Sequence, residues 1–450
     1  MSRLAGWALN CLYVVLFTAA SPWIVWSAVR HGKHREGFAA KFLGLAPRRE
    51  GDRPCVWLHA VSVGEVNLLA TTIAEILAQR PDWEIVVSTT TKTGYDLACK
   101  KYADRSVFYC PLDFTWATAA AMRRVRPALL VLAELELWPN LIAVAKRRGV
   151  KVAIINGRLS DKSFRGYRRI RAFVAPSLRR LDLIAAQNEE IAERFRQLGA
   201  RPVTVRATGS LKFDGAQTNR RNSRTLALQE LAGLDDRSVV FLAGSTQEPE
   251  EQYALDIFHR LAPSHPELKL ILVPRHPQRF DEVAALLNAS GVLWQRRSQL
   301  TPTMSGKQGN EAAAHRWRVL LVDTIGELGA WWGTAAIGFI GGSFGSRGGQ
   351  NMLEPAAYGV ATCFGPNTWN FRDIVAQLLA ADGARVVRSE EEFDAFVRQA
   401  LESPEFARQL GERAQRLVLS QQGATRRTVE LLCSLHTAPA TTATPARLAA

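Results

Sequence analysis

Short apolar runs alternate with longer segments of helical periodicity along most of this chain. The run at residues 55–59, for example, precedes a segment at 65–79 whose apolar residues recur every three or four positions. Alternation of strand, helix and strand is typical of parallel sheets with helices on both faces. The first predicted set of strands covers residues 55–59, 84–89, 129–133, 152–155, 183–186 and 203–207.

The same pattern then repeats in the second half of the chain. Residues 214–223 are polar and predict a linker between a domain at 30–213 and a domain at 224–435. Two such Rossmann-like domains form a cleft lined by the carboxyl ends of both strand sets. We expect a surface loop at 296–315 and a disordered tail at 436–450. The second set of strands covers residues 239–243, 269–273, 319–322, 336–340 and 360–363.

The N-terminal segment differs from the rest because residues 4–29 carry no charge. About 20 apolar residues suffice for a helix to span a bilayer. The segment therefore predicts a single-pass anchor, and Pro22 leaves open a shallow insertion at the membrane interface. Basic residues concentrate behind it, which predicts that the remaining chain stays cytoplasmic. These residues are Arg30, Lys33, Arg35 and Lys41, against Arg3 alone in front.

The net charge and the composition of the chain limit the classes of binding partner to be expected. The 450-residue chain has 57 basic and 42 acidic side chains, a net charge of +15. This excess favours an anionic partner such as a lipid surface or a nucleotide, although a solvated basic surface explains it equally well. The six cysteines form no CxxC pair, which favours a reducing compartment. No phosphate loop, Asp-x-Asp metal motif or nucleic-acid-binding module is present, so we expect neither a metal ion nor a nucleic acid partner.

A candidate general base follows the first predicted strand. Glu65 lies in the segment HAVSVGE, where a carboxylate can take a proton from a sugar hydroxyl that lies within hydrogen-bond reach. The competing interpretation is structural, because Ser62 and Glu65 have the spacing of a helix capping box. On spacing alone, the capping box is the better supported interpretation.

Two further segments of the first half carry charged candidates. Glu134 and Glu136 directly follow the apolar strand at 129–133, where active sites form in parallel sheets. An acidic first turn of a helix explains them equally well. Lys212, after the strand at 203–207, can meet negative charge on a leaving phosphate, but a surface lysine is the default.

The second half carries the predicted nucleotide site. Arg275 follows the strand at 269–273 and has the planar fork that pairs with phosphate. The segment at 323–328 starts a predicted helix, where amides bind anions or a plain cap suffices. The most specific signal is the glycine-rich stretch at 341–349, followed by Asn351 and Glu354. Glycines let the backbone approach a phosphate, and Glu354 can accept from a ribose.

Taken together, these segments resemble the 3-deoxy-D-manno-octulosonic acid (Kdo) transferases of lipopolysaccharide synthesis. The resemblance covers nearly the whole chain and follows the order of the family's motifs. The matching segments are HAVSVGE at 59–65, ELELWPN at 134–140, NGRLS at 156–160, AAQNEE at 185–190, TGSLKFD at 208–214, PRHPQRF at 274–280, DTIGEL at 323–328 and GGQNMLEP at 348–355.

The resemblance implies an α/β protein of the GT-B class, with two Rossmann-like domains and an N-terminal anchor in the cell inner membrane. It implies CMP-Kdo as donor, the lipid A precursor lipid IVA as acceptor, and inverting transfer without a cofactor. Glu65 matches the family's proton acceptor, and Glu134 and Lys212 match its stabilisers of the transition state. Its CMP-contacting positions match Pro274, Arg275, Ile325, Gly326, Glu327, Asn351, Met352, Leu353 and Glu354.

Departures from the family pattern are small and affect fine specificity alone. Ala60 replaces a common serine, Gly157 a common alanine, and Met352 a common proline. Two alternatives remain open at the level of sequence: another membrane-associated GT-B enzyme that uses a UDP-sugar, and a non-catalytic protein that binds a nucleotide sugar. The number of Kdo residues transferred is not determined by these motifs.

Overall fold

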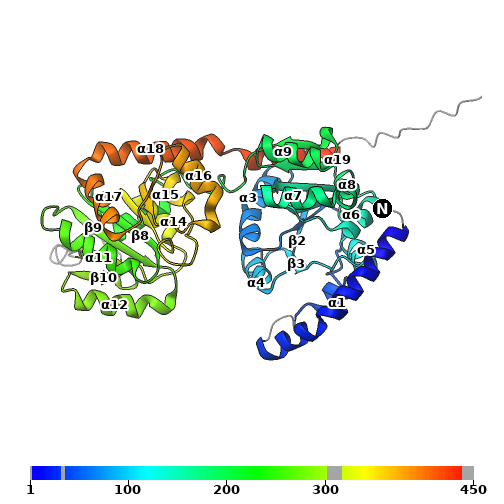
Figure 1. Ribbon diagram of the computed structural model, residues 1–450, viewed down its shortest axis with the longest axis horizontal. Coiled ribbons are helices and arrows are strands. Elements are labelled where there is room, and N and C mark those ends of the chain that lie inside the picture. The colour runs from blue at the N-terminus through cyan, green and yellow to red at the C-terminus, as the bar shows by residue number, and fades with distance from the viewer. Residues whose placement is uncertain (1–2, 32–35, 302–316, 438–450) are drawn as a thin grey trace, which may run out of the picture. The chain divides into compact units, whose positions relative to one another are not determined.

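The protein folds into two α/β units, each built on its own parallel sheet (Figure 1). The computed structural model describes residues 3–31, 36–301 and 317–437. Unit 1 comprises Met1–Gly215 together with Gln422–Ala450, and unit 2 comprises Ala216–Gln421. The two-domain α/β architecture predicted from the alternating pattern is confirmed.

Unit 1 contains a seven-stranded parallel sheet in the order β3-β2-β1-β4-β5-β6-β7. The order reverses between β1 and β4, which pair directly, and such a reversal is where ligands bind in open α/β sheets. Four of the predicted strands have the expected bounds. The strands are β1 (Cys55–His59), β2 (Glu84–Thr89), β3 (Ser106–Tyr109), β4 (Leu129–Ala133), β5 (Lys151–Gly157), β6 (Leu183–Ala186) and β7 (Val205–Ala207).

Alternating side chains of β1 explain why both faces of this sheet are covered by helices. Val56 and Leu58 belong to one apolar layer with residues of α3 and α19, whereas Trp57 belongs to the opposite layer with residues of α5 and α6. The helices of unit 1 are α1 (Arg3–His31), α2 (Phe38–Leu43), α3 (Val63–Gln79), α4 (Lys92–Lys101), α5 (Thr115–Val125), α6 (Pro139–Arg147), α7 (Asp161–Arg169), α8 (Arg171–Leu178), α9 (Glu189–Gln197) and α19 (Ala424–Thr437).

Unit 2 contains a second seven-stranded parallel sheet, in the order β10-β11-β9-β8-β12-β13-β14. Its order reverses between β8 and β12. The strands are β8 (Val239–Thr246), β9 (Leu268–Pro274), β10 (Trp294–Arg296), β11 (Val319–Leu321), β12 (Ile337–Ile340), β13 (Ala361–Phe364) and β14 (Arg385–Val386). The helices are α10 (Ser223–Leu231), α11 (Glu250–Leu261), α12 (Phe280–Ala289), α14 (Leu328–Trp331), α15 (Leu353–Ala357), α16 (Arg372–Ala380), α17 (Glu390–Glu402) and α18 (Pro404–Gln421).

Three strands were missed by the sequence pattern: β3, β10 and β14. All three lie at the edge of a sheet, and each has at most four residues. An edge strand is buried less completely, so its apolar run is short and mixed. The predicted loop at 296–315 begins in β10 and the 3₁₀ turn Arg297–Gln299, and residues 302–315 lie outside the described residues.

The end of the chain differs from the predicted domain 224–435, because α19 packs with unit 1 rather than with the second sheet. Ala424, Val429 and Leu432 join the apolar layer over β1. The Asp214 carboxylate accepts from the backbone amides of Gly423 and Thr425, at the start of α19. Residues 436 and 437 of the predicted disordered tail are helical, and 438–450 lie outside the described residues.

The predicted linker at 214–223 is anchored at both ends. Asp214 belongs to unit 1 through α19, and Arg220 belongs to unit 2. The Arg220 guanidinium donates to the carbonyls of Tyr358 and Ala335, both at 2.8 Å. The boundary between the units falls between Gly215 and Ala216.

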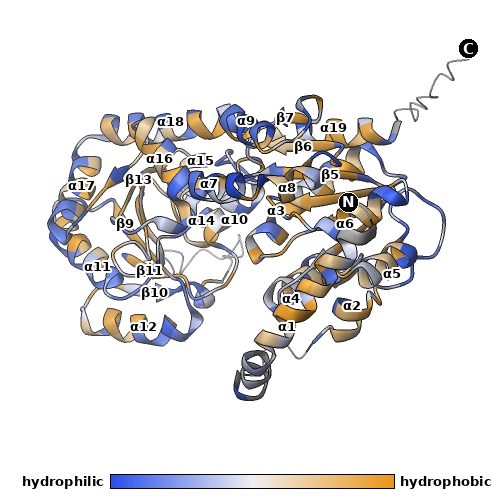
Figure 2. Ribbon diagram, turned by 45° about the vertical axis from the view of Figure 1, so that its right-hand side comes forward, coloured by the Kyte–Doolittle hydropathy of each residue, from blue (hydrophilic) through white to orange (hydrophobic). Residues whose placement is uncertain are grey.

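The N-terminal segment is the 29-residue helix α1, as predicted, but no helix in the described part of the chain is both long and apolar enough to cross a bilayer. The predicted single-pass anchor is therefore not supported. Polar contacts tie α1 to unit 1 instead. The Asn10 amide donates to Thr115 Oγ1 at 2.7 Å, and the Tyr13 hydroxyl donates to the buried carboxylate of Asp113 at 3.1 Å. Apolar residues nevertheless remain along α1 and α2 (Figure 2).

Candidate active site and nucleotide site

The charged candidates of unit 1 gather at the point where its strand order reverses. Glu65 follows β1 and Glu134 follows β4, and these two strands are neighbours in register, with His59 opposite Leu132. Because parallel strands end at the same edge, both carboxylates lie at the carboxyl edge of the sheet.

Glu65 forms the capping box that its spacing indicates. Ser62 is the N-cap of α3, and its hydroxyl oxygen accepts from the Glu65 amide at 3.3 Å. The Glu65 carboxylate accepts in turn from the Ser62 hydroxyl at 2.8 Å and from the Val61 amide at 2.9 Å. These bonds fix the buried carboxylate at the first turn of α3. A carboxylate held in one position also meets the geometric requirement of a general base.

Glu134 and Lys212 are brought together from segments 78 positions apart in the chain. Lys212 Nζ lies 3.9 Å from Glu134 Oε1. Glu134 adopts a left-handed backbone conformation, with φ of 55°, and its amide donates to the Ile155 carbonyl at 2.9 Å. Such a conformation is costly for a residue with a side chain and is typical of functional sites. It turns the chain away from β4 and ends the strand direction that Glu134 and Glu136 were expected to share.

Glu136 is a third carboxylate of this region. Burial and the charge of Glu65 raise its pKa to about 6, with Glu134 adding to the effect, while a hydrogen bond from the Trp138 indole at 3.0 Å opposes the rise. The charge of Glu65 thus reaches Glu136, which places the segments after β1 and β4 in one electrostatic cluster. Lys212, 3.9 Å from Glu134, is the basic side chain of this cluster.

Asn156 supports the segment that carries Lys212. It is fully buried at the end of β5, and its Oδ1 accepts from the Leu211 amide at 3.1 Å. This bond links the NGRLS segment to the TGSLKFD segment. Spacing could not have predicted it, because 55 residues separate the two partners.

In unit 2, Arg275 and Glu354 lie within electrostatic range of each other. The Arg275 amide donates to the Thr246 carbonyl at 3.0 Å, which fixes the backbone of this residue beside the end of β8 and leaves its side chain exposed. Burial raises the pKa of Glu354, and a hydrogen bond from the Asn351 amide group at 3.0 Å and the charge of Arg275 oppose that rise. Pro274, the residue before Arg275, ends β9 and is buried.

In the segment after β11, Ile325 and Gly326 are accessible, whereas the Glu327 carboxylate is held within the protein. The Glu327 carboxylate is held by Arg297 through two bonds of 2.8 and 2.9 Å and accepts from Thr324 Oγ1 at 2.8 Å. Ile325 is 80% exposed, and Gly326 has φ of 90°, so these two residues form the accessible tip. Glu327 therefore shapes the loop, and Arg297 is a supporting residue that sequence patterns missed.

The glycine-rich stretch also differs from its predicted use. The amides of Gly342, Ser343 and Phe344 donate to the buried carboxylate of Glu250, so they are occupied within the protein. Met352 and Leu353 are buried, which leaves their backbone as the part that can contact a ligand. Asn351 is exposed at the start of α15. Glu250 was missed because its segment, STQEPEE, offers no pattern beyond an acidic first turn.

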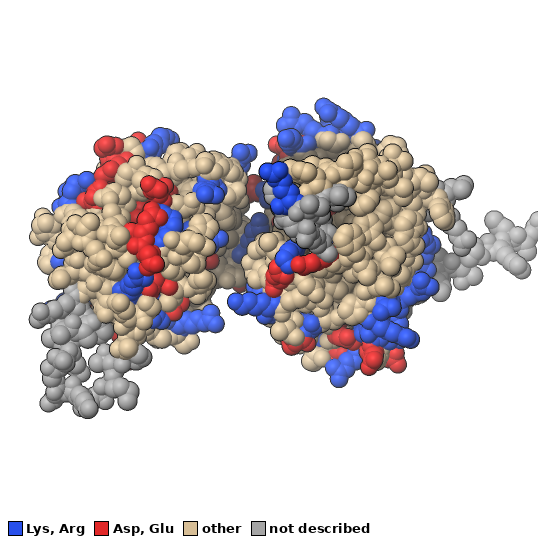
Figure 3. Space-filling model, turned by 90° about the horizontal axis from the view of Figure 1, so that it is seen from below, with Lys and Arg blue, Asp and Glu red and all other residues tan. Residues whose placement is uncertain are grey.

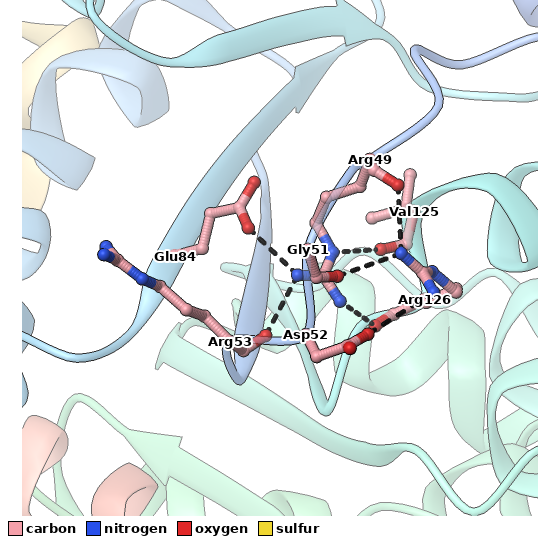
Figure 4. A network of polar contacts seen from close by, with 7 residues as sticks. All are labelled: Arg49, Gly51, Asp52, Arg53, Glu84, Val125 and Arg126. Carbon is pink, nitrogen blue, oxygen red and sulfur yellow. Dashed lines mark hydrogen bonds and ion pairs between the residues drawn. The ribbon is translucent and has the colours of Figure 1, made fainter.

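A cavity in each unit of the described chain lies at the opposite edge of its sheet. A cavity of about 330 Å³ is lined by Arg49 and by Glu84, which begins β2. The Arg49 guanidinium is satisfied by Glu84 at 2.9 Å and by the backbone carbonyls of Val125 and Arg53, as Figure 4 shows. A cavity of about 500 Å³ in unit 2 includes Val239, the first residue of β8. Both therefore lie at the amino ends of strands, away from the candidate residues.

Among the described residues, neither the distribution of surface charge nor a group of metal-binding side chains singles out one site. Lys and Arg side chains are spread over both units on the face drawn in Figure 3, mixed with groups of Asp and Glu. Within the described ranges, no three His, Cys, Asp or Glu side chains are placed to hold a metal ion. The expectation that transfer needs no metal remains a prediction.

Comparison with known proteins identifies the family. The model of the 3-deoxy-D-manno-octulosonic-acid transferase family matches residues 33–215. The 3-deoxy-D-manno-octulosonic acid transferase of Bordetella pertussis is 34% identical over 91% of this chain and 94% of its own length. The enzyme of the same name from Haemophilus influenzae is 33% identical over 90% of this chain and 92% of its own length.

Among solved structures, a UDP-GlcNAc 2-epimerase from Neisseria meningitidis has a TM-score of 0.55 at 14% identity, covering 84% of this chain and all of that one. This likeness concerns the fold alone. Sequence similarity over nearly the full length of two relatives, together with a family model that matches the domain carrying Glu65, Glu134 and Lys212, shows that the chain belongs to the Kdo transferase family of glycosyltransferases.

Proposed function

We propose that this member of the family transfers Kdo from CMP-Kdo to the lipid A precursor lipid IVA, with inversion at the anomeric carbon. The observation that carries the proposal is the arrangement at the carboxyl edge of the first sheet. There, hydrogen bonds hold the Glu65 carboxylate after β1, and the Lys212–Glu134 pair lies after the neighbouring strand β4. A fixed base and a fixed cation are the two groups that such a transfer requires.

In the proposed reaction, Glu65 accepts the proton of the acceptor's sugar hydroxyl. The hydroxyl oxygen then forms a bond to the anomeric carbon of Kdo, while the bond from that carbon to the CMP phosphate breaks. The leaving phosphate takes the electron pair, and positive charge on Lys212 lowers the energy of the negative charge that develops. Glu134 orients the Lys212 ammonium group through their contact of 3.9 Å.

The donor's nucleotide is assigned to unit 2. Arg275 supplies a guanidinium for the phosphate, the exposed tip at Ile325 and Gly326 supplies backbone contacts, and Glu354 accepts from the ribose. Asn351 donates to Glu354 at 3.0 Å and so fixes the direction of that carboxylate. Glu327 contributes indirectly, because Arg297 and Thr324 hold its carboxylate.

Association with the cytoplasmic surface of the inner membrane is part of the proposal. Exposed apolar side chains concentrate on α1 and α2, where they can enter the interface between headgroups and acyl chains without crossing the bilayer. The net charge of +15 favours anionic lipids. The side chains concerned are Trp7, Leu12, Val14, Val15, Leu16, Trp23, Trp26, Phe38 and Leu43.

The test is incubation of the purified protein with lipid IVA and CMP-Kdo generated in situ, followed by mass spectrometry of the lipid. We expect lipid IVA to gain one or more Kdo residues, and the mass also gives the number of transfers. A matched incubation with UDP-sugars is the control. Transfer from a UDP-sugar with no product from CMP-Kdo would overturn the proposal.

A further inference from the structure

Glu250 holds the turn after β12 with a single buried carboxylate. Its side chain lies at the start of α11, directly after β8, and the residue is 1% exposed. One oxygen accepts from the amides of Gln247 at 2.9 Å and Gly342 at 2.7 Å. The other accepts from the amides of Ser343 at 2.9 Å and Phe344 at 3.0 Å. Four backbone donors thus converge on one carboxylate.

The turn around this carboxylate is closely packed. A Cβ at Gly341 would lie 2.5 Å from Thr246 Cα and 2.8 Å from Glu250 Oε2, so only glycine allows this approach. The buried Ser343 hydroxyl donates to the Ile340 carbonyl at 2.6 Å and accepts from the Gly365 amide at 2.8 Å. The conformation of the turn is therefore determined by Glu250 and by contacts that surround it.

The effect of Glu250 reaches the residues assigned to the donor. The Gly349 amide donates to the Gly342 carbonyl at 2.8 Å, so the second part of the glycine-rich stretch is tied to the part that Glu250 holds. Asn351 and Met352 follow shortly after Gly349 and precede α15, whose first two residues are Leu353 and Glu354. Glu250 also reaches Arg275, because it accepts from the Gln247 amide, and the Thr246 carbonyl of the same peptide group accepts from the Arg275 amide.

We infer that Glu250 is a positioning residue for the nucleotide donor: by collecting the amides of Gln247, Gly342, Ser343 and Phe344, it holds the glycine-rich stretch in the conformation that presents Asn351 and Glu354 to the nucleotide. Glu250 touches no substrate in this assignment. The inference rests on the proposed function of unit 2 as the donor site. It adds Glu250 as the residue that holds the conformation of this site.

The experiment compares Glu250→Gln with Glu251→Gln in the full-length protein. Glutamine keeps the size of the side chain but places an NH₂ group against two backbone donors, so part of the amide set loses its acceptor. Glu251 is the matched control. It is also 1% exposed and lies on the next position of α11, but its carboxylate accepts from Arg279 at 2.7 Å and forms no hydrogen bond with the turn.

We expect Glu250→Gln to raise KM for CMP-Kdo by about tenfold or more, with kcat at saturating donor changed less than about threefold. We expect Glu251→Gln to change KM less than about twofold. Glu250→Asp, which keeps a carboxylate one methylene shorter, should recover part of the donor affinity. A fall in kcat with unchanged KM would mean that Glu250 only keeps the unit folded, and an equal rise of KM in both glutamine variants would equally overturn the inference.

Nucleotide binding separates this inference from the proposed function. Calorimetry measures the affinity of the wild type and both variants for CMP and, in parallel, for UDP. If the wild type binds UDP and not CMP, the proposed donor is wrong, but the loss of UDP affinity in Glu250→Gln relative to Glu251→Gln still tests the role of Glu250. Should Glu250→Gln fail to fold, Glu250→Asp carries the same comparison.

Discussion

Lys212 Nζ lies 3.9 Å from Glu134 Oε1, although 78 positions separate the two residues in the chain. Lys212 extends from the segment after β7, and Glu134 lies directly after β4. The Lys212 side chain is 40% exposed, so the pair contributes little to stability. Its position at the carboxyl edge of the sheet, which also carries Glu65 and Glu136, makes a chemical role the better explanation.

Replacement of Lys212 tests that role. We expect Lys212→Met to lower kcat about a hundredfold, because the charge that meets the leaving phosphate is lost. The free energy of unfolding should change by less than about 1 kcal/mol. Steady-state kinetics and urea denaturation measure the two effects. Lys146→Met is the control, since Lys146 pairs with Asp182 at 2.6 Å outside the candidate site and should leave kcat intact.

Glu65→Gln separates the capping interpretation from the catalytic one. Glutamine is accepted at this position of a capping box, so the melting temperature should stay close to that of the wild type. It cannot accept a proton, and we expect transfer to fall by a factor of about 10² to 10⁴. Product formation is followed by mass spectrometry and folding by circular dichroism. Undiminished transfer by this variant would remove Glu65 from the mechanism.

Glu136 predicts a pH-dependent stability. Its pKa is raised from 4.5 to about 6, first by burial, so the folded protein binds the proton more tightly than the unfolded chain. The contribution of Glu136 to stability therefore falls as pH rises through this range. Glu136→Gln carries no charge at either pH, so relative to the wild type it should gain melting temperature between about pH 4.5 and about pH 7.

Glu282 supplies a control of opposite sign for that measurement. Hydrogen bonding and the charge of Arg279 lower the pKa of the Glu282 carboxyl, so its contribution is present above the ordinary pKa and is lost as the pH falls. Glu282→Gln should therefore lose melting temperature relative to the wild type as the pH rises towards about 4.5, with little further change above that pH. Shifts of the same sign in both variants would contradict the assignment for Glu136.

We expect an added methyl group to affect stability very differently at Gly341 and at Gly345. A Cβ at Gly341 would lie 2.5 Å from Thr246 Cα and 2.6 Å from the Ser245 carbonyl oxygen, and backbone atoms cannot move aside cheaply. We expect Gly341→Ala to destabilise unit 2 by about 1–3 kcal/mol. A Cβ at Gly345 meets nothing within 4 Å, so Gly345→Ala should change stability by less than about 0.5 kcal/mol. Urea denaturation gives both values.

The exposed apolar side chains of α1 predict binding to vesicles. A triple variant with serine at Trp7, Val15 and Leu16 removes side chains that are 63%, 64% and 57% exposed. We expect its affinity for anionic phospholipid vesicles to fall about tenfold or more, because each lost side chain removes apolar burial in the interface. Co-sedimentation measures this affinity. Phe173→Ser is the control, because Phe173 is 81% exposed on α8 and its loss should leave vesicle affinity unchanged. An equal loss of vesicle affinity in both variants would mean that α1 is not the membrane contact.

The class of fold, the resemblance to the family and the segments with candidate chemistry were all recognisable from the amino-acid sequence. Parallel strands buried on both faces, such as β1, β4 and β9, leave continuous apolar runs that a linear pattern reveals. Because these apolar runs show where the strands end, the polar residues directly after them can be recognised as candidates for the carboxyl edge of the sheet. Edge strands such as β14 carry no such signal, because two half-buried residues do not form a pattern.

The tertiary structure alone decided which groups are paired and which are already occupied. Lys212 meets Glu134, Asp214 caps α19, and Glu250 takes the amides that the glycine-rich stretch was expected to offer a phosphate. Each of these contacts joins residues separated by dozens of positions, and spacing along the chain carries no information about such pairs. Burial is the physical reason for the Glu250 contacts, because a carboxylate can lie inside the protein only when surrounding groups, here backbone amides, supply its hydrogen bonds.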